Sequence, residues 1–267
     1  MSSGRSLVTG ASSGIGATYA DRLARRGHDL VLVARDEARL EALAAQLRAQ
    51  AGVEVEVLAA DLSQPSGVAQ VENRLREDSR LTMLVNNAGI AMSGAFAAAE
   101  PARLDAIIAL NVTALTRLAA AAATGFVARG TGTIVNIASV TALMPEKFGA
   151  VYVATKAYVL ALSQALDAEL GRQGVRVQAV LPGVTRTGIW DRAGLNLEQI
   201  PAAMVMGVDE MVDAALAGLD QGEAVTIPSL PDYADWEAFT QARLRLLPNL
   251  SRNHAASRYL DKPTTAQ

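Results

Sequence analysis

Short runs of aliphatic and β-branched residues alternate along this chain with longer segments in which apolar residues recur every three to four positions. The short runs predict seven strands, over residues 6–8, 29–34, 53–59, 83–85, 133–137, 175–181 and 224–227. The longer segments predict helices over residues 15–26, 37–51, 67–78, 102–129, 151–172 and 208–218. Because runs such as residues 30–34 are continuously apolar, helices should cover both faces of the sheet. Right-handed crossovers then give an α/β fold, a doubly wound, seven-stranded parallel sheet in a three-layer sandwich.

A single domain accounts for the whole chain, residues 1–267. The alternation of strands and helices continues to residue 227 without a linker, a low-complexity block or an internal repeat. Beyond it, residues 228–267 form a tail that contains several prolines and one predicted helix over residues 233–247. The composition of this tail does not indicate its role.

Composition and charge exclude several classes of protein. The chain has no Cys and only two His, so disulfides and the ordinary zinc sites cannot form, and we expect no bound metal. A net charge of -3, with both signs interspersed, offers no basic face to nucleic acid. We find no apolar run of roughly 18 residues and no signal-peptide core, so we expect a cytoplasmic protein without a membrane partner.

A glycine-rich turn follows the first predicted strand and leads directly into a helix. Its sequence, Thr-Gly-Ala-Ser-Ser-Gly-Ile-Gly over residues 9–16, has the spacing G-x-x-x-G-x-G. Glycines let the backbone approach a pyrophosphate, and the free N–H groups at a helix start attract its negative charge. The turn therefore predicts a dinucleotide site, although a merely flexible connection remains the alternative. The expected contacts are Gly10, Ser12, Ser13, Gly14, Ile15 and Gly16.

Tyr152 and Lys156 lie four residues apart in a predicted helix, so their side chains should share one face, one turn apart. A phenol with its ordinary pKa of about 10 is a poor general base at neutral pH. A neighbouring ammonium favours the phenolate and lowers that pKa. The pair therefore indicates acid–base chemistry at Tyr152.

These two motifs, together with Asn-Asn-Ala-Gly at residues 86–89, resemble the single-domain branch of the short-chain dehydrogenase/reductase family over residues 6–227. The resemblance implies a Rossmann-type NAD(P)-binding domain. It also implies that Asn87, Ala88 and Gly89 lie under the adenosine ribose, and that Asp61, followed by Leu62, bonds the adenine amino group. A strand-ending turn and a helix cap are the structural alternatives for these segments. After the sixth strand, the family turn that contacts the nicotinamide amide corresponds to Pro182, Gly183, Thr185 and Thr187.

The choice between NADP and NAD depends on the end of the second predicted strand, which has the sequence Ala34-Arg35-Asp36. An acidic residue there repels the 2′-phosphate of NADP, whereas an arginine binds it through its planar fork. Members that prefer NAD usually carry Asp at the position of Ala34, and those that prefer NADP carry Arg directly after it. Arg35 therefore favours NADP, and Asp36, one residue further on, keeps NAD as the alternative cofactor.

The resemblance also assigns the reacting groups. Tyr152 gives a proton to the substrate oxygen as hydride arrives, and Lys156 bonds the nicotinamide ribose. Ser139, thirteen residues before Tyr152, bonds the substrate carbonyl, and Asn111 holds a water in the proton relay. Each of these two could instead be a structural polar residue.

We therefore expect an NADP-preferring oxidoreductase that transfers hydride between nicotinamide and a carbonyl or secondary alcohol. Residues 188–207 match the family lid, and their apolar side chains favour a hydrophobic or medium-sized carbonyl compound. A non-catalytic NAD(P)-dependent sensor on the same fold is the alternative from another class, and an NAD-preferring dehydrogenase is a third. The Ala-rich helix over residues 102–129 and the helix that carries Tyr152 predict a homodimer or homotetramer.

Overall fold

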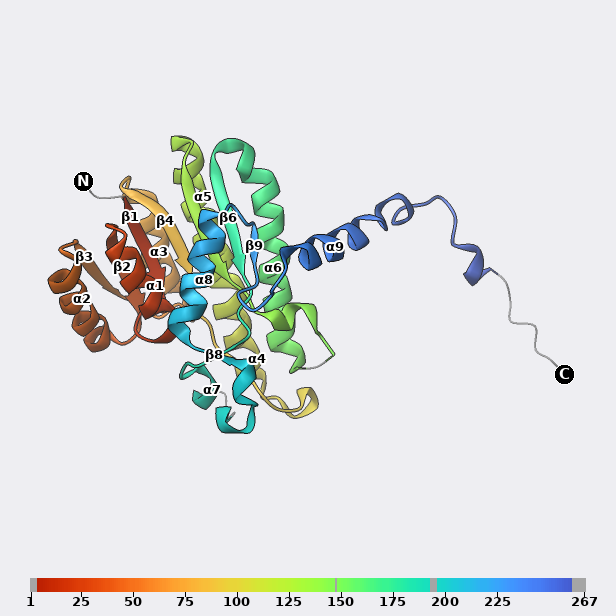
Figure 1. Ribbon diagram of the computed structural model, residues 1–267, viewed down its shortest axis with the longest axis horizontal. Helices are drawn as coiled ribbons and strands as arrows, with labels where there is room; N and C mark the ends of the chain where they lie inside the picture. Colours follow the sequence, from red (N-terminus) through yellow and green to blue (C-terminus); the bar gives the residue numbers. More distant parts are fainter. Residues whose placement is uncertain (1–3, 147, 193–195, 261–267) are drawn as a thin grey trace. The chain divides into compact units, whose positions relative to one another are not determined.

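The computed structural model describes residues 4–146, 148–192 and 196–260. Its centre is a parallel seven-stranded sheet with the order β3-β2-β1-β4-β5-β6-β9, which confirms the predicted doubly wound fold (Figure 1). The strands are β1 (Arg5–Thr9), β2 (Asp29–Ala34), β3 (Val55–Ala59), β4 (Leu81–Asn86), β5 (Gly132–Ile137), β6 (Val175–Val180) and β9 (Val225–Thr226). The order reverses between β1 and β4, and ligands of such sheets bind outside the carboxyl ends of the strands at that point.

Helices cover both faces of the sheet, so two separate cores form. The strand residues alternate between these cores: Leu7 packs on one side and Val8 on the other. Helices α1 (Gly14–Arg25), α2 (Glu37–Ala51) and α8 (Val208–Asp220) supply the first core. The second core receives α3 (Pro65–Glu77) and α5 (Leu115–Arg129), together with the end of α6 (Ala150–Leu170).

The helix predicted over residues 102–129 is not regular. It consists of α4 (Pro101–Ile108), a π-helical segment η2 (Ala109–Ala114) and α5. We expected no segment capable of spanning a membrane, but this helix is long and apolar enough by length and composition alone, with a mean hydropathy of 1.6. Leu118, Ala122 and Phe126 are buried in the second core, which is the packing of a core helix.

The predicted lid over residues 188–207 contains structure too short to produce a recognisable period. A second sheet pairs β7 (Val184–Thr185) with β8 (Val205–Met206), and this pair was not predicted. Helix α7 (Ile189–Arg192) lies between them, and lid residues 193–195 fall outside the described residues. The remaining short helices are η1 (Phe96–Ala98), η3 (Val140–Leu143), η4 (Gly171–Gln173), η5 (Leu197–Gln199) and η6 (Ala202–Met204).

The chain divides into two units, Met1–Pro228 and Ser229–Gln267. The second contains α9 (Tyr233–Leu244), η7 (Leu247–Asn249) and η8 (Ser257–Tyr259). Asp232 caps α9, since its carboxylate accepts a hydrogen bond of 2.9 Å from the backbone N–H of Ala234. The helix ends three residues before the predicted position 247, close to Pro248, which cannot donate a backbone hydrogen bond.

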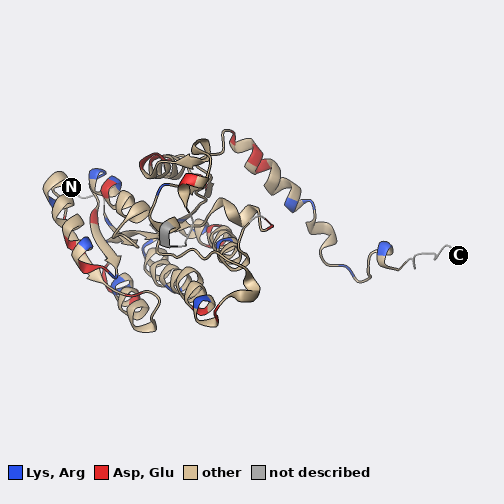
Figure 2. Cartoon of the chain, turned by 90° about the horizontal axis from the view of Figure 1, so that it is seen from below, with Lys and Arg blue, Asp and Glu red and all other residues tan. Residues whose placement is uncertain are grey.

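Acidic and basic residues are interspersed along the helices, as Figure 2 shows. Many of them form ion pairs between neighbouring helices. Arg22 of α1 binds Asp213 of α8 with Nε 2.7 Å from Oδ1, and Arg117 of α5 binds Glu72 of α3 through two nitrogens. Charged residues therefore connect the outer helices in pairs of opposite sign.

Candidate functional site

The glycine turn between β1 and α1 forms a backbone cradle that side chains would obstruct. Gly10 adopts φ +66°, a conformation that favours glycine. At Gly16 a Cβ would overlap the carbonyl oxygen of Gly10 and lie 2.5 Å from Nδ2 of Asn87. Ser13 is the N-cap of α1 but makes no side-chain capping bond, so the first N–H groups of the helix are not satisfied by a cap. Such a cradle fits a pyrophosphate.

Thr9 fastens this turn to the end of β4, and it is a site residue that the sequence interpretation missed. Its hydroxyl oxygen accepts hydrogen bonds of 3.0 Å from the backbone N–H groups of both Asn87 and Ala88. In return, Asn87 Nδ2 donates to the carbonyl oxygens of Thr9 at 2.9 Å and Gly10 at 3.3 Å. The position of Thr9 directly before Gly10, at a strand end, was the available signal. Asn87 thus holds the cradle in shape.

At the end of β2, Arg35 and Asp36 differ in whether their side chains are engaged by neighbouring groups. The Asp36 carboxylate caps α2, accepting from the Arg39 N–H at 3.1 Å, and it also pairs with the Arg39 guanidinium at 3.1 Å. Arg35 is exposed, and its side chain has no ion pair among the described residues. The acidic group that could oppose a 2′-phosphate is therefore engaged locally, while the cation next to it remains accessible.

Asp61 follows β3, and its Oδ1 accepts hydrogen bonds from the N–H of Ser63 at 2.9 Å and from its hydroxyl at 2.7 Å. Burial opposes the charge of this carboxylate, but the bonds from Ser63 and the positive charge of Arg35 together hold its pKa below the ordinary value. Asp61 is not the N-cap of α3, which is Gln64. The neighbouring Leu62 is buried and packs in the second core.

Helix α6 and the end of β5 bring the three predicted reacting groups together. Tyr152 and Lys156 both come from α6, and Ser139 follows β5 as the N-cap of η3. The Lys156 ammonium donates to the carbonyl oxygen of Ile137 at 2.9 Å and lies 5.8 Å from the centre of the Tyr152 ring. The predicted common face of α6 is therefore present.

Burial governs the proton affinities at this end. It lowers the pKa of Lys156 to about 8. It also raises the pKa of Tyr152 above its ordinary value, against the opposing effect of a hydrogen bond with Ser139. We predicted that Lys156 would lower the pKa of the phenol, and that direction was wrong. Desolvation opposes the charged forms of both groups, and at Tyr152 it exceeds the effect of the Ser139 hydrogen bond.

Asn111 lies in the π-helical segment η2 and is buried. Its side-chain amide makes two hydrogen bonds of 2.9 Å with the backbone of Ile90: Oδ1 accepts from the N–H, and Nδ2 donates to the carbonyl oxygen. The same amide nitrogen is 3.2 Å from the hydroxyl of Thr155, the residue before Lys156. Asn111 thus connects the segment after β4 with α6, and π-helical turns often occur at functional positions.

A cavity of about 70 Å³ brings together half of the predicted site residues. It is lined by Ile15, Asn87, Gly89, Ser139, Tyr152, Lys156, Pro182, Gly183, Thr185 and Thr187, and also by Ile137, Ala138, Ile189 and Trp190. Arg35, Asp61, Leu62 and Asn111 do not line it, nor do Gly10, Ser12, Ser13, Gly14, Gly16 and Ala88. The methyl group of Thr187 nevertheless lies 3.2 Å from the position of a Cβ on Gly14, so the turn over residues 182–187 reaches the glycine turn.

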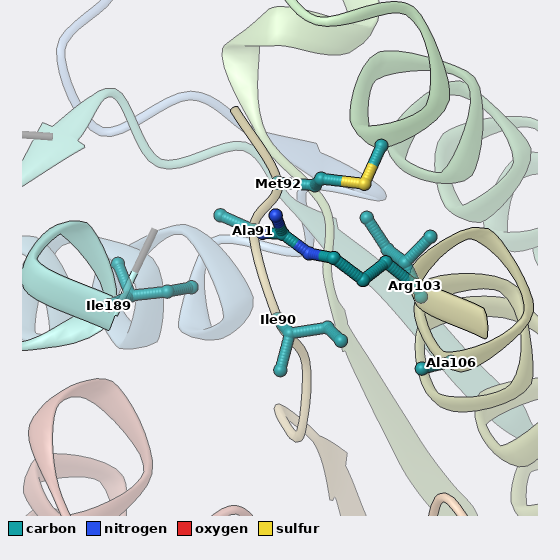
Figure 3. A pocket seen from close by; sticks show the side chains of 7 residues that line it. Ile90, Ala91, Met92, Arg103, Ala106 and Ile189 are labelled. Carbon is teal, nitrogen blue, oxygen red and sulfur yellow. The ribbon is translucent and has the colours of Figure 1, made fainter. Parts of the chain in front are cut away.

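A second cavity, of about 170 Å³, shares Ile189 with the first (Figure 3). Six of its lining residues are apolar: Ile90, Ala91, Met92, Ala106, Ile107 and Ile189. Arg103 of α4 is the remaining one. An apolar space thus adjoins the reacting groups.

Comparison with known proteins places this geometry in a family. The short chain dehydrogenase model matches residues 5–197. An uncharacterized oxidoreductase of Staphylococcus epidermidis is 34% identical over 211 residues, which span 76% of this chain and 90% of that protein. A solved short-chain dehydrogenase from Sphingobium yanoikuyae, in complex with NADPH, is 57% identical, with a TM-score of 0.93 over 96% of this chain and 99% of that one.

A second solved structure is also similar along nearly the whole chain. It is the bulky-bulky ketone specific alcohol dehydrogenase from Comamonas testosteroni, 49% identical, with a TM-score of 0.90 over 98% of this chain and 100% of that one. The matched residues 5–197 include the glycine turn, Ser139 and the pair on α6. The chain belongs to the short-chain dehydrogenase family of oxidoreductases.

Proposed function

We propose that this protein is an NADP(H)-dependent carbonyl reductase or alcohol dehydrogenase in which Tyr152 is the proton donor to the substrate oxygen. The observation that carries the proposal is the meeting of Tyr152, Lys156 and Ser139 in one cavity with the turn over residues 182–187. A phenol, a buried ammonium and a hydroxyl at the wall of an apolar space suit the reduction of a ketone.

The cofactor assignment rests on two features of this chain. The uncapped glycine turn fits a pyrophosphate, and the accessible guanidinium of Arg35 fits a 2′-phosphate. A relative that is 57% identical was crystallised with NADPH, and this supports the same choice here. When bound, NADP(H) supplies or accepts the hydride. The residues of the chain bind it, orient the substrate and move the proton.

The proton affinities suit the reducing direction. Because burial raises the pKa of Tyr152, its phenol stays protonated at neutral pH and can give its proton to a developing alkoxide. Ser139, whose hydroxyl is 3.2 Å from the N–H of Thr141, stands beside it to bond the same oxygen. Lys156, with a pKa of about 8, remains charged at pH 7 and stabilises the negative charge left on Tyr152. Asn111 positions α6 through Thr155.

The substrate is a bulky, hydrophobic ketone or the corresponding secondary alcohol. Six apolar side chains line the second cavity, and a relative of 49% identity is named for bulky-bulky ketones.

We further propose a cytoplasmic homodimer or homotetramer. The outer face of α6 exposes Ala154, Ala161 and Ala165, small residues that let a partner helix approach closely. Light scattering that shows a strict monomer would contradict this assembly.

Tyr152→Phe tests the proposal. The variant should bind NADPH with unchanged affinity but reduce bulky aryl ketones 10²- to 10⁴-fold more slowly, because positioned general acids contribute about that factor. Stopped-flow oxidation of NADPH measures the loss, and fluorescence titration of NADPH is the control. Undiminished turnover would refute the role of Tyr152. NADPH binding by the unmodified protein, without oxidation by any ketone in a broad panel, would favour a sensor instead.

Arg35→Asp tests the cofactor. The change replaces a phosphate partner by a repelling charge, so the Kd of NADPH should rise at least tenfold while the Kd of NADH, which lacks the 2′-phosphate, changes little. Titrations with both cofactors measure the effect, and NADH serves as the internal control. An equal response of the two cofactors would show that Arg35 does not contact the 2′-phosphate.

A further inference from the structure

The cavity of about 170 Å³ beside the reacting groups contains one charged side chain among its seven lining residues, Arg103. We propose that Arg103 binds a carboxylate on the substrate, so that the enzyme prefers ketones that carry an acid group remote from the carbonyl. The inference rests on the proposed function, because it names the substrate class of the same site. Specificity would then come from a guanidinium that takes no part in the proton transfer.

Arg103 reaches the cavity from α4, where its backbone N–H donates to the carbonyl oxygen of Glu100 at 3.0 Å. Figure 3 shows its side chain extending from the helix across the cavity toward Ala91, with Ile90 and Met92 on either side. The aliphatic part of Arg103 thus covers apolar surface, and the guanidinium lies over the segment that follows β4. A ligand in the cavity would meet this charged group.

The guanidinium of Arg103 has no ion pair and no side-chain hydrogen bond to any part of the chain whose side chains the structure describes. In contrast, Arg22 and Arg74 each bind two or more carboxylates. No acidic residue lines either cavity. A planar fork without a partner, beside an apolar space, is suited to a bidentate bond with a carboxylate.

The size of the space limits what lies between the two polar ends. A cavity of about 150 Å³ accommodates a benzene ring, and this one has about 170 Å³. Ile189 borders both this cavity and the one that contains Tyr152 and Ser139. A ligand with its carbonyl at Tyr152, an aromatic ring in the larger cavity and a carboxylate at Arg103 matches this sequence of groups. Acylbenzoates have this arrangement.

A matched pair of ketones separates charge from shape. We would measure the Kd of 4-butanoylbenzoate and of its methyl ester for the NADP-loaded enzyme by calorimetry, and kcat/KM for both with NADPH. Arg103→Met keeps the apolar part of the side chain and should weaken carboxylate binding about tenfold, with the ester changed less than twofold. Arg103→Lys should recover part of the loss. Arg172→Met, at an exposed arginine of η4, is the control and should change neither ligand.

Equal losses for acid and ester in Arg103→Met would overturn the inference, since the residue would then act through shape or folding. An unmodified enzyme that binds the ester as tightly as the acid would also overturn it. If the acid binds in an Arg103-dependent manner but neither ketone is reduced, the carboxylate site at Arg103 stands, whereas the proposed function fails and the assigned substrate class fails with it. If the ester is reduced and the acid shows no dependence on Arg103, the function stands and this inference fails.

Discussion

Replacing Lys156 with Met should stabilise the cofactor-free protein at neutral pH while it destroys the proposed reaction. Folding removes this ammonium from water: Lys156 is 7% exposed, and burial lowers its pKa from 10.5 to about 8. Its hydrogen bond to the Ile137 carbonyl, 2.9 Å long, offsets only part of that cost. The site therefore retains a charge that opposes folding.

The size of the effect follows from the two pKa values. At about 1.4 kcal/mol for each tenfold change in proton affinity, the buried charge costs about 3 kcal/mol at pH 7. In Lys156→Met the Ile137 carbonyl loses its donor, which costs about 1–2 kcal/mol. The variant should thus be more stable by about 1–2 kcal/mol.

The pH dependence has a definite sign. Between about pH 8 and pH 10.5 the unfolded chain binds more protons at Lys156 than the folded chain does, so wild-type stability rises with pH in this window. By pH 10 the cost of the charge has fallen to about 1 kcal/mol, and the advantage of the variant should vanish or reverse.

Urea unfolding of the cofactor-free proteins at pH 7 and pH 10 measures both effects. Arg172→Met is the control. Because arginine does not titrate between pH 7 and pH 10, the difference in unfolding free energy between this variant and wild type should be the same at both pH values. A Lys156→Met protein that is less stable than wild type at pH 7, by an amount independent of pH, would refute the reasoning.

Two further changes test the cradle and a buried ion-pair cluster. Gly16→Ala adds about 1 kcal/mol of helix propensity, but the added Cβ would overlap the Gly10 carbonyl oxygen. We therefore expect the Kd of NADPH, measured by fluorescence titration, to rise at least tenfold. An unchanged affinity would contradict the close approach of the two segments. Asp78→Asn breaks a cluster in which Asp78 Oδ2 lies 2.9 Å from both Arg5 and Arg74, and urea unfolding at pH 7 should show a loss of about 3 kcal/mol. Burial opposes the charge of Asp78, but its hydrogen bonds and the two arginines hold its pKa in the folded protein below the ordinary 3.8. The contribution of Asp78 to folding stability is therefore fully present above pH 3.8, and it is lost as the pH falls through the lower pKa of the folded state. A difference between Asp78→Asn and wild type that persists unchanged at pH 2.5 would contradict this assignment.

Local sequence patterns sufficed for the strands of the main sheet and for the groups that share one face of a helix, but not for the β7–β8 pair or the π-helical segment. The seven strands were recognisable because buried parallel strands are continuous apolar runs, and Tyr152 and Lys156 share a face because the helix repeats every 3.6 residues. The glycine turn was also recognisable from the sequence, because segments of backbone that approach closely leave no room for a Cβ and therefore require glycine. All these features depend on residues a few positions apart.

Contacts between distant segments settled the rest. The π-helical turn at Asn111 accompanies bonds to Ile90 and Thr155, 21 and 44 residues away, and no local period encodes them. The upward shift of the Tyr152 pKa follows from burial in the packed fold, which outweighs the hydrogen bond with Ser139. Arg103, an ordinary helix residue in the sequence, became a candidate for substrate recognition because α4 places it over a cavity. Burial and electrostatic environment are sums over the packed fold, whereas a one-dimensional pattern reports only neighbours along the chain.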